Sequence, residues 1–244
     1  MQFMNQTSDA IASNLFRVRQ SIAEAARLAG RDPLGIRLIA VSKNHPHEAV
    51  AAAIESGHKD FGESTIQEAV PKISQLVNKD KSVTWHYIGH LQKNKAKFVP
   101  HNFSWLHSLD DPDLARKLSR LALEQSENIN ILIEVNVSRD PRKHGVAPDA
   151  LLEFIDQLLK ENLPALSLRG LMTIGPHNAP EREIRRCFAS LRELRDECGK
   201  RLALPGFTEL SMGMSADYAE AIKEGATMLR IGTAIFGERD YARK

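Results

Sequence analysis

Eight short apolar stretches recur along the chain and alternate with longer stretches of helical periodicity. Several of them are continuously apolar, which is typical of parallel strands buried on both faces of a sheet. They cover residues 36–43, 59–64, 84–90, 104–110, 129–138, 166–174, 207–214 and 227–237. The pattern therefore predicts eight parallel strands.

The segments between these strands read as amphipathic helices, with apolar residues at helical spacing such as Leu114, Leu118 and Leu121. The predicted helices cover residues 47–56, 63–77, 113–125, 148–161, 181–198 and 217–224, and another precedes the first strand at 8–29. Strands separated by helices predict an α/β protein, a (β/α)8 TIM barrel with an extra N-terminal helix. A doubly wound open sheet is the alternative.

Length and composition fit a barrel. The chain has 244 residues, and a barrel of this type needs about 250, so we expect one domain over residues 1–244. Hydrophobic residues make up 42% and charged residues 26%, which is ordinary for a globular protein and excludes a disordered chain. The net charge of +2 gives no indication of a nucleic-acid partner.

Signals for export, membrane insertion and metal binding are not apparent in the sequence. No apolar run reaches the roughly 18 residues of a membrane span, and residues 1–19 have no apolar core of a signal peptide. Cys187 and Cys198 would lie about 16 Å apart along a helix, beyond the reach of a disulfide. We expect a cytoplasmic protein with free thiols and no metal site.

Polar residues and glycines gather at the predicted strand ends, where a TIM barrel carries its active site. Lys43 follows the apolar run LIAVS, and a partly desolvated lysine amine can attack an aldehyde. Ser211, Gly213, Gly232 and Thr233 follow the last two strands, where small residues let backbone N–H groups approach a phosphate. The alternatives are an ordinary lysine that reaches solvent and ordinary tight turns.

Arg230 stands two residues before Gly232 and so shares its face of the strand. An arginine donates hydrogen bonds and accepts none, so beside a pyridine nitrogen it would keep that nitrogen unprotonated. The alternative is an ion pair with an acidic neighbour. A reactive lysine opposite a phosphate-binding turn is what pyridoxal 5'-phosphate (PLP) needs.

Other candidates carry less chemistry. His86 and His90 are four residues apart and would face the same side of the predicted strand over 84–90, but they lack the chemistry of an HExxH metal site. Lys93, Lys95 and Lys97 form a basic stretch that is either simply solvated or attracts anionic ligands, including free PLP.

Several segments resemble the signatures of the pyridoxal phosphate homeostasis proteins, a family once called proline-synthetase-associated. The resemblance spans about residues 8–241, and LSMGMS followed by RIGTAIFG is its most specific part. The segments are VSK at 41–43, FGE at 61–63, WHYIGHLQKNK at 85–95, HSLD at 107–110, LRGLMTI at 168–174, LSMGMSADYAEAI at 210–222 and RIGTAIFGERDY at 230–241.

The resemblance implies a PLP barrel of fold type III, similar to the N-terminal domain of alanine racemase. By the matching motifs, Lys43 would hold PLP as a Schiff base. Ser211, Gly232 and Thr233 would hold the phosphate, with help from the backbone around Gly213.

The same resemblance places Arg230 at the pyridine nitrogen and Met212 and Met172 near the ring or the phosphate. The family usually shows Asn where this chain has Ser64. Because serine is shorter and offers a hydroxyl in place of an amide, we expect a modestly altered affinity for PLP.

The function that the resemblance implies is PLP binding in vitamin B6 homeostasis, without robust catalysis. We expect a monomer whose partners are PLP and PLP-dependent acceptor enzymes, with no nucleic acid and no membrane. The alternative, an amino-acid racemase, needs a second acid/base group opposite the lysine. In alanine racemase a separate C-terminal domain of the partner subunit supplies a tyrosine, whereas Tyr87, Tyr218 and Tyr241 of this chain stand on no added domain. A third possibility is a barrel for a phosphorylated sugar or indole-type ligand without PLP.

Overall fold

Eight parallel strands close into a barrel in the computed structural model, which describes residues 2–76 and 79–238. The strands follow chain order, and β1 (Arg37–Val41) pairs with both β2 (Asp60–Glu63) and β8 (Met228–Ile231). The others are β3 (Thr84–Tyr87), β4 (Trp105–Leu109), β5 (Ile129–Glu134), β6 (Leu166–Met172) and β7 (Glu209–Ser211). The predicted TIM barrel is confirmed, and the open sheet is wrong because the first strand pairs with the last.

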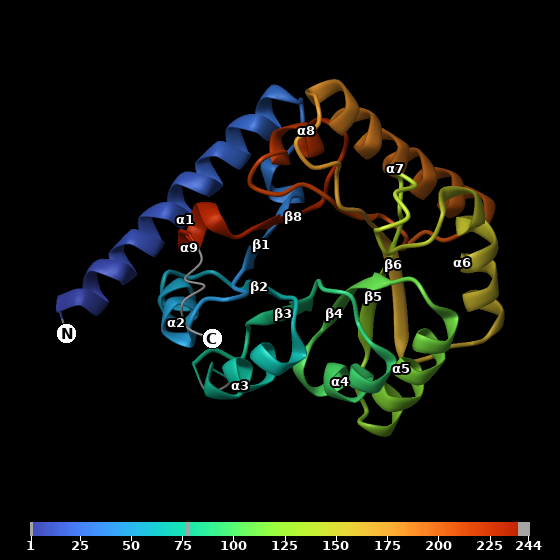
Figure 1. The fold of residues 1–244 in the computed structure, drawn as a ribbon, viewed down its shortest axis with the longest axis horizontal. Helices are drawn as coiled ribbons and strands as arrows, with labels where there is room; N and C mark the ends of the chain where they lie inside the picture. Colours follow the sequence, from blue (N-terminus) through green and yellow to red (C-terminus); the bar gives the residue numbers. More distant parts are fainter. Residues whose placement is uncertain (1, 77–78, 239–244) are drawn as a thin grey trace.

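Helices surround the barrel, as Figure 1 shows. The larger ones that follow strands are α2 (His47–Glu55), α3 (Ile66–Leu76), α5 (Pro112–Glu124), α6 (Leu151–Lys160), α7 (Glu181–Arg201) and α8 (Tyr218–Lys223). Short helical turns are η1 (Pro33–Gly35), η2 (Lys93–Phe98), α4 (Val99–Asn102), η3 (Pro148–Ala150) and α9 (Thr233–Phe236). Within the described ranges, the structure contains no helix with the length and apolar character needed to cross a membrane.

The extra N-terminal helix is confirmed as α1 (Gln2–Leu28). Its buried residues Ile11, Leu15, Ile22 and Ala26 recur at helical spacing and form one apolar face. This face packs against α2, α8 and α9. The helix therefore braces the place where the first and last strand–helix units meet.

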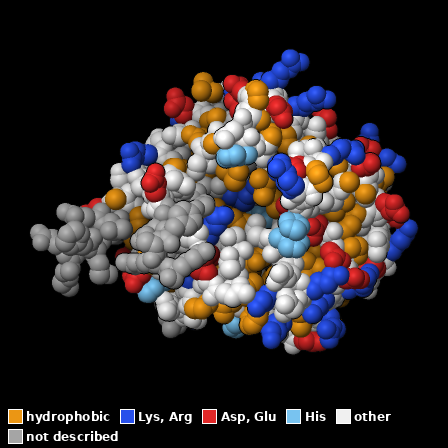
Figure 2. All heavy atoms as spheres, in the orientation of Figure 1, with side chains coloured by type: hydrophobic (Ala, Val, Ile, Leu, Met, Phe, Trp, Pro, Cys, Tyr) orange, Lys and Arg blue, Asp and Glu red, His pale blue; other side chains and the backbone are white. Residues whose placement is uncertain are grey.

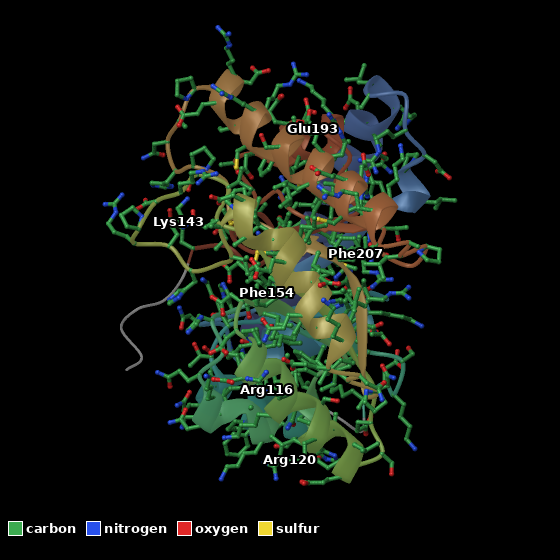
Figure 3. The ribbon with its side chains drawn as sticks, turned by 90° about the vertical axis from the view of Figure 1, so that its right-hand side faces the viewer. Arg116, Arg120, Lys143, Phe154, Glu193 and Phe207 are labelled. Carbon is green, nitrogen blue, oxygen red and sulfur yellow. The ribbon has the colours of Figure 1, made fainter. Side chains whose placement is uncertain are left out.

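The apolar core has two parts, because successive residues of a strand point to opposite faces. The larger part lies between the strands and the helices. A smaller cluster fills the inside of the barrel and consists of Ile39, Trp105, Leu132, Met172 and Met228. In the side view of Figure 3, Lys143 marks the end of the barrel where the strands finish, and Phe207 lies toward the opposite end.

Several strands are shorter than predicted. The stretch over 84–90 is a strand only to Tyr87, so His86 and His90 do not share one strand face. The stretch over 129–138 is a strand only to Glu134. The stretch over 227–237 is a strand only to Ile231, because Thr233–Phe236 turns into α9 and buries Ile235 helically. The apolar character of these stretches predicted their burial correctly, but it did not predict where each strand ends. Val77, at the end of the helix predicted over 63–77, lies outside the described residues.

The cysteine prediction is confirmed. Cys187 and Cys198 both lie buried on α7 as free thiols. Burial raises the pKa of Cys187 to about 11, which makes it a poor nucleophile near neutral pH.

Candidate functional site

The carboxyl ends of the strands surround a hollow at the centre of the face shown in Figure 2, and Lys or Arg side chains are visible in it. On the side of β5 and β6 a pocket extends this hollow, and its lining includes Glu134, Asn136, Lys143 and Thr173. The polar strand ends predicted from the sequence thus lie around one opening, which we call the mouth.

Lys43 is half-buried and lies two residues beyond the end of β1. It follows Val41, whose carbonyl oxygen lies so close to Gly232 that an added methyl group there would be 3.0 Å from it. Lys43 and Gly232 therefore occupy neighbouring strand ends. Asn44, next in the chain, adopts a left-handed conformation with φ 61° and donates its N–H to Glu68 Oε1 at 2.6 Å.

A buried ion pair holds the residue before Lys43. Lys72 Nζ donates to Glu63 Oε1 at 2.6 Å and to the carbonyl oxygen of Ser42 at 2.8 Å. The Ser42 hydroxyl donates to the same Glu63 oxygen at 2.7 Å. Burial raises the pKa of Glu63, and the ammonium of Lys72 opposes that effect. These contacts lie outside the barrel wall and fix the point from which Lys43 leaves it.

Arg230 projects into the barrel and is 6% exposed. Its Nη1 donates to the Ser211 hydroxyl at 2.6 Å, and its Nη2 donates to the carbonyl oxygen of Thr173 at 2.9 Å. Burial lowers the pKa of Arg230 to about 10, although Glu134 and Asp217 act in the opposite direction. The guanidinium therefore stays charged at neutral pH and lies at the base of the mouth. No hydrogen-bonded ion pair holds Arg230 among the described residues, so the paired-arginine alternative is not supported.

A chain of buried polar groups continues from Ser211 across the barrel. Ser211 Oγ lies 2.9 Å from His107 Nδ1, and His107 Nε2 lies 3.0 Å from His86 Nδ1. His86 Nε2 lies 3.1 Å from Asp60 Oδ1, at the start of β2. Ser211, His107 and His86 are each 0% exposed. Neither His107 nor Asp60 is predicted from the sequence to belong to a site.

Ser211 and Met212 are both fully buried. The Ser211 hydroxyl contacts Arg230 and His107 below the mouth. Met212 is the next residue, points to the opposite face and is fully buried in the core between strands and helices. Met172 does point inside the barrel. Met212 therefore does not contribute its side chain to the mouth.

Two glycines shape the turns after β7 and β8. Gly213 has φ +97°, and a methyl group there would lie 2.6 Å from Ala221 Cβ. Its carbonyl oxygen accepts the Arg230 N–H at 3.0 Å, which ties the end of β7 to β8. Beyond it, Asp217 Oδ1 accepts the Met214 N–H at 2.6 Å and closes a turn that exposes Ser215. Gly232 and the exposed Thr233 begin α9 beside it.

Ser64 is half-buried one residue beyond β2. Its carbonyl oxygen accepts the Tyr87 hydroxyl at 3.2 Å, and a methyl group on Gly89 would lie 2.2 Å from that oxygen. The backbone here is fixed by close packing, so a change at Ser64 acts mainly through its side chain. Burial raises the pKa of Tyr87 to about 12, and Tyr87 belongs to the core outside the barrel.

Sequence comparison with known proteins identifies the family. The family model described as "Alanine racemase, N-terminal domain" matches residues 8–240. The pyridoxal phosphate homeostasis protein of Escherichia coli K12 is 42% identical over 238 residues, which cover 96% of this chain and 99% of that protein. The chain belongs to the pyridoxal phosphate homeostasis protein family. The resemblance stated from the motifs is confirmed.

Solved structures agree with this membership. PipY of Synechococcus elongatus has been determined without PLP and with PLP bound, at 40% and 39% identity and TM-scores of 0.80 and 0.78. In both cases the match covers 88% of this chain and all of that one. Alanine racemase of Clostridium difficile is 15% identical with a TM-score of 0.68, over 94% of this chain and 56% of that one. That likeness concerns the barrel fold alone.

His90, Asp110 and His144 form the group of described residues at the mouth that could hold a metal ion, with ligand atoms within 4.8 Å of one another. The His90 and His144 rings stack with centroids 3.7 Å apart and an interplanar angle of 10°. Ring nitrogens donate their lone pairs in the ring plane, so those of stacked rings run side by side instead of converging on one ion. The arrangement therefore suits an apolar contact between the rings better than a preformed metal site.

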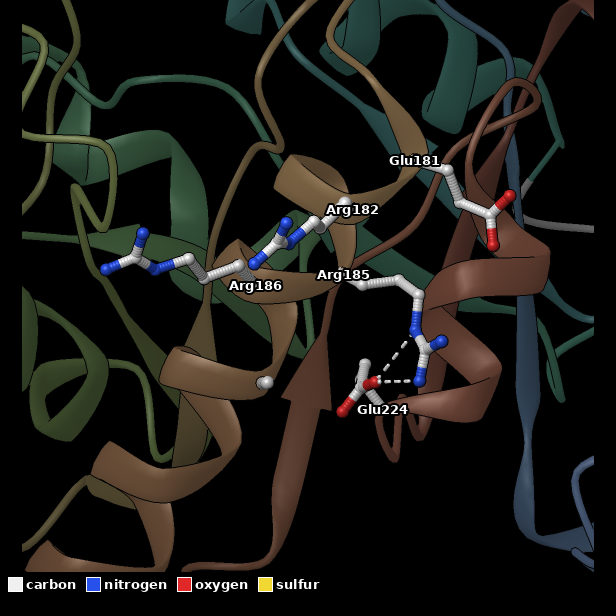
Figure 4. A pocket seen from close by; sticks show the side chains of 6 residues that line it. Glu181, Arg182, Arg185, Arg186 and Glu224 are labelled. Carbon is white, nitrogen blue, oxygen red and sulfur yellow. Dashed lines mark hydrogen bonds and ion pairs between the residues drawn. The ribbon is translucent and has the colours of Figure 1, made fainter.

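A second depression lies away from the mouth, between α7 and α8 (Figure 4). Glu224 accepts hydrogen bonds from Arg185 there, whereas Arg182 and Arg186 point away from Glu224. The depression holds an ion pair that joins two helices and contains no group suited to attack an aldehyde.

Proposed function

We propose that this protein binds PLP at the mouth of the barrel, covalently through Lys43, and holds it without robust catalysis. The observation that carries the proposal is the buried, charged Arg230 at the base of the mouth, on the strand that pairs with the one leading to Lys43. Membership of a family in which PipY has a structure with PLP bound supports it.

The residues present fit this group. PLP supplies an aldehyde to which a lysine amine can attach, an electron-withdrawing ring and a phosphate. The half-buried Lys43 offers the amine, and Arg230 offers a donor to the ring nitrogen. Because Arg230 is held by Ser211 and Thr173 and cannot accept a proton, it would leave the nitrogen of a bound PLP ring unprotonated. A ring in that state withdraws electrons weakly, which favours holding over turnover.

The phosphate would lie at the turns after β7 and β8. Gly232 lets the end of β8 lie close to Val41, since a side chain there would press on that residue. Thr233 and Ser215 are exposed beside it and offer hydroxyl donors. We therefore assign the phosphate to Gly232, Thr233, the backbone after Gly213 and Ser215, and assign Ser211 to Arg230.

The absorbance spectrum of the purified protein tests this proposal. We expect a band near the visible range that borohydride removes, with the reduced adduct mapping to the peptide that contains Lys43. Lys43→Ala should lose the adduct, while Lys160→Ala, at an exposed site on α6, should keep it. A protein without the band, or with the adduct on another lysine, contradicts the proposal and favours a barrel for a different phosphorylated ligand.

A racemase is the second candidate because Glu134 lines the mouth and burial raises its pKa to about 7. A group with that pKa suits proton transfer at neutral pH. Interconversion of D- and L-alanine or serine, lost in Lys43→Ala and in Glu134→Gln, would establish this activity. Turnover near the rate of PLP alone supports the holding role.

The physiological proposal is vitamin B6 homeostasis: a cytoplasmic monomer that takes up PLP and passes it to PLP-dependent enzymes. Relatives described as pyridoxal phosphate homeostasis proteins support this proposal, among them those of Escherichia coli and Pasteurella multocida. The Pasteurella multocida protein is 38% identical over 96% of this chain and 99% of that protein. Incubation of the loaded protein with an apoenzyme should restore that enzyme's activity, and size-exclusion chromatography should give the mass of one chain.

A further inference from the structure

The inside of the barrel carries a polar chain where barrels of this kind usually pack branched apolar side chains. The chain starts at Asp60, whose side chain is 25% exposed near the amino ends of the strands. It passes through His86 and His107 to Ser211 and ends at Arg230. His107 on β4 and Ser211 on β7 come from strands that do not pair, so the contact between them crosses the interior.

The direction of the hydrogen bonds in this chain follows from the carboxylate. A carboxylate only accepts, so His86 must carry its proton on Nε2, which faces Asp60. A neutral imidazole has one donor and one acceptor, so His86 Nδ1 accepts from His107 Nε2. His107 Nδ1 then accepts from the Ser211 hydroxyl. The lone pairs of Ser211 are left to accept from Arg230 Nη1.

Neutral histidines are the state that the surroundings favour. Burial lowers the pKa of both His86 and His107. Cations stand at both ends of the chain, since Arg37 lies 3.7 Å from Asp60 Oδ1 and Arg230 contacts Ser211. Although partial burial alone would raise the pKa of Asp60, its hydrogen bond with His86 and the charge of Arg37 bring it below its ordinary value. Asp60 is therefore the anion that sets the direction.

We propose that Asp60 is a positioning residue for Arg230, acting through the tautomers of His86 and His107 and the hydroxyl of Ser211. Without the carboxylate, the His86 Nε2 proton has no buried acceptor, and the chain is free to reverse. In the reversed chain of hydrogen bonds, Ser211 accepts from both His107 Nδ1 and Arg230 Nη1, so its own proton loses the acceptor that holds the hydroxyl in place beneath Arg230. The link to PLP rests on the proposed function, whereas the tautomers of His86 and His107 follow from the hydrogen bonds alone.

The first test is the protonation of the two rings in the full-length wild-type protein. Long-range proton–nitrogen NMR of histidine-labelled protein at pH 7 should show His86 and His107 neutral, each with its proton on Nε2, with the signals assigned from His86→Gln and His107→Gln. A proton on Nδ1 of either ring, or a charged imidazolium, overturns the proposal. This result does not depend on PLP or on the folding of any Asp60 variant.

The second test compares Asp60→Leu, which removes the acceptor, with Asp60→Asn, which can keep one. We expect Asp60→Leu to reverse the histidine tautomers and to weaken PLP binding about tenfold, as for the loss of one hydrogen bond to a charged group. Asp60→Asn should retain the tautomers and bind PLP within about twofold of wild type, as should the control Glu209→Leu, a carboxylate at the start of β7 outside the chain.

The outcomes are distinct. Unchanged PLP affinity in a folded Asp60→Leu protein with reversed tautomers overturns the positioning role. Unchanged histidine tautomers in that protein overturn the role of Asp60 in setting the direction of the hydrogen bonds. Failure of the wild-type protein to bind PLP at Lys43 contradicts the proposed function instead. The tautomer result then still decides whether Asp60 sets the direction of the hydrogen bonds.

Discussion

Lys72 stabilises the end of β1, because its ammonium forms a buried ion pair with Glu63. Removing one partner of a buried ion pair leaves the other charge unpaired, which typically costs 3–5 kcal/mol. We therefore expect Lys72→Met to lower the free energy of unfolding by roughly 3–5 kcal/mol. It should also weaken PLP binding, because Lys72 holds the carbonyl oxygen of Ser42.

The effect of Lys72→Met should depend on pH. Burial already raises the pKa of Glu63, and the loss of the ammonium raises it further. The folded protein then binds a proton that the unfolded chain releases, so stability falls as pH rises through neutral. Urea unfolding at pH 6 and pH 8 measures this, and Glu63→Gln added to Lys72→Met should remove most of the pH dependence. A loss equal at both pH values contradicts the ion-pair explanation.

Glu134 predicts a pH effect of its own. Burial raises its pKa from an ordinary 4.5 to about 7. Since the folded-state pKa is the higher one, the contribution of Glu134 to stability is greatest below pH 4.5 and is lost as pH rises to about 7. Glu134→Gln should therefore gain stability over wild type by about 2–3 kcal/mol more at pH 8 than at pH 5, measured by urea unfolding. An equal difference at both pH values would show that Glu134 titrates normally.

Ser64 is the residue where the motif resemblance leads us to expect Asn instead. Asn would carry a longer amide at this strand end, while the backbone is already fixed by Tyr87 and Gly89. We expect Ser64→Asn to bind PLP about two- to fivefold more tightly, as for one added hydrogen bond. Fluorescence titration measures the change, with Thr65→Asn, at the exposed neighbouring residue, as the control. Equal affinities for Ser64→Asn and wild type would count against a contact from this position.

At the scale of elements, the turn after β7 depends on Gly213. Its φ of +97° is in the region that side chains rarely adopt, and Leu229 and Ala221 occupy the space of a methyl group. Gly213→Ala should lower stability by about 3 kcal/mol or more, from backbone strain and overpacking together. Gly35→Ala, with no atom within 4 Å of the added methyl and no positive φ, should shift the melting temperature little. Similar melting temperatures for the two variants would contradict the assigned role.

Elements were predictable where apolar periodicity is unambiguous and less so at their ends. The strand bodies and the long helices follow from patterns of period two and 3.6. The run TAIF reads equally well as strand or helix, and only the turn at Gly232 decides for α9. The helical segment 93–102 was not predicted, since three lysines recur at every second position of its first half and Pro100 interrupts its second half.

For the whole molecule, the closed barrel followed from eight strand–helix units, but the contents of its interior did not. Lys43, Gly232 and Arg230 were found because they stand at strand ends. His107 and Asp60 were missed because their contacts form between side chains of different strands, and the contact from His107 to Ser211 joins residues 104 positions apart. One signal was available: His86 and His107 occupy the third positions of short strands, where a barrel interior usually holds a branched apolar residue.

The packed barrel interior also determines how a ligand travels. Ile39, Trp105, Leu132, Met172 and Met228 fill the centre, so a molecule bound at the mouth has no exit through the barrel. Uptake and release must use the same opening, one after the other. Under the proposed function, bound PLP must therefore leave the mouth before a second molecule can enter, so loading and release alternate.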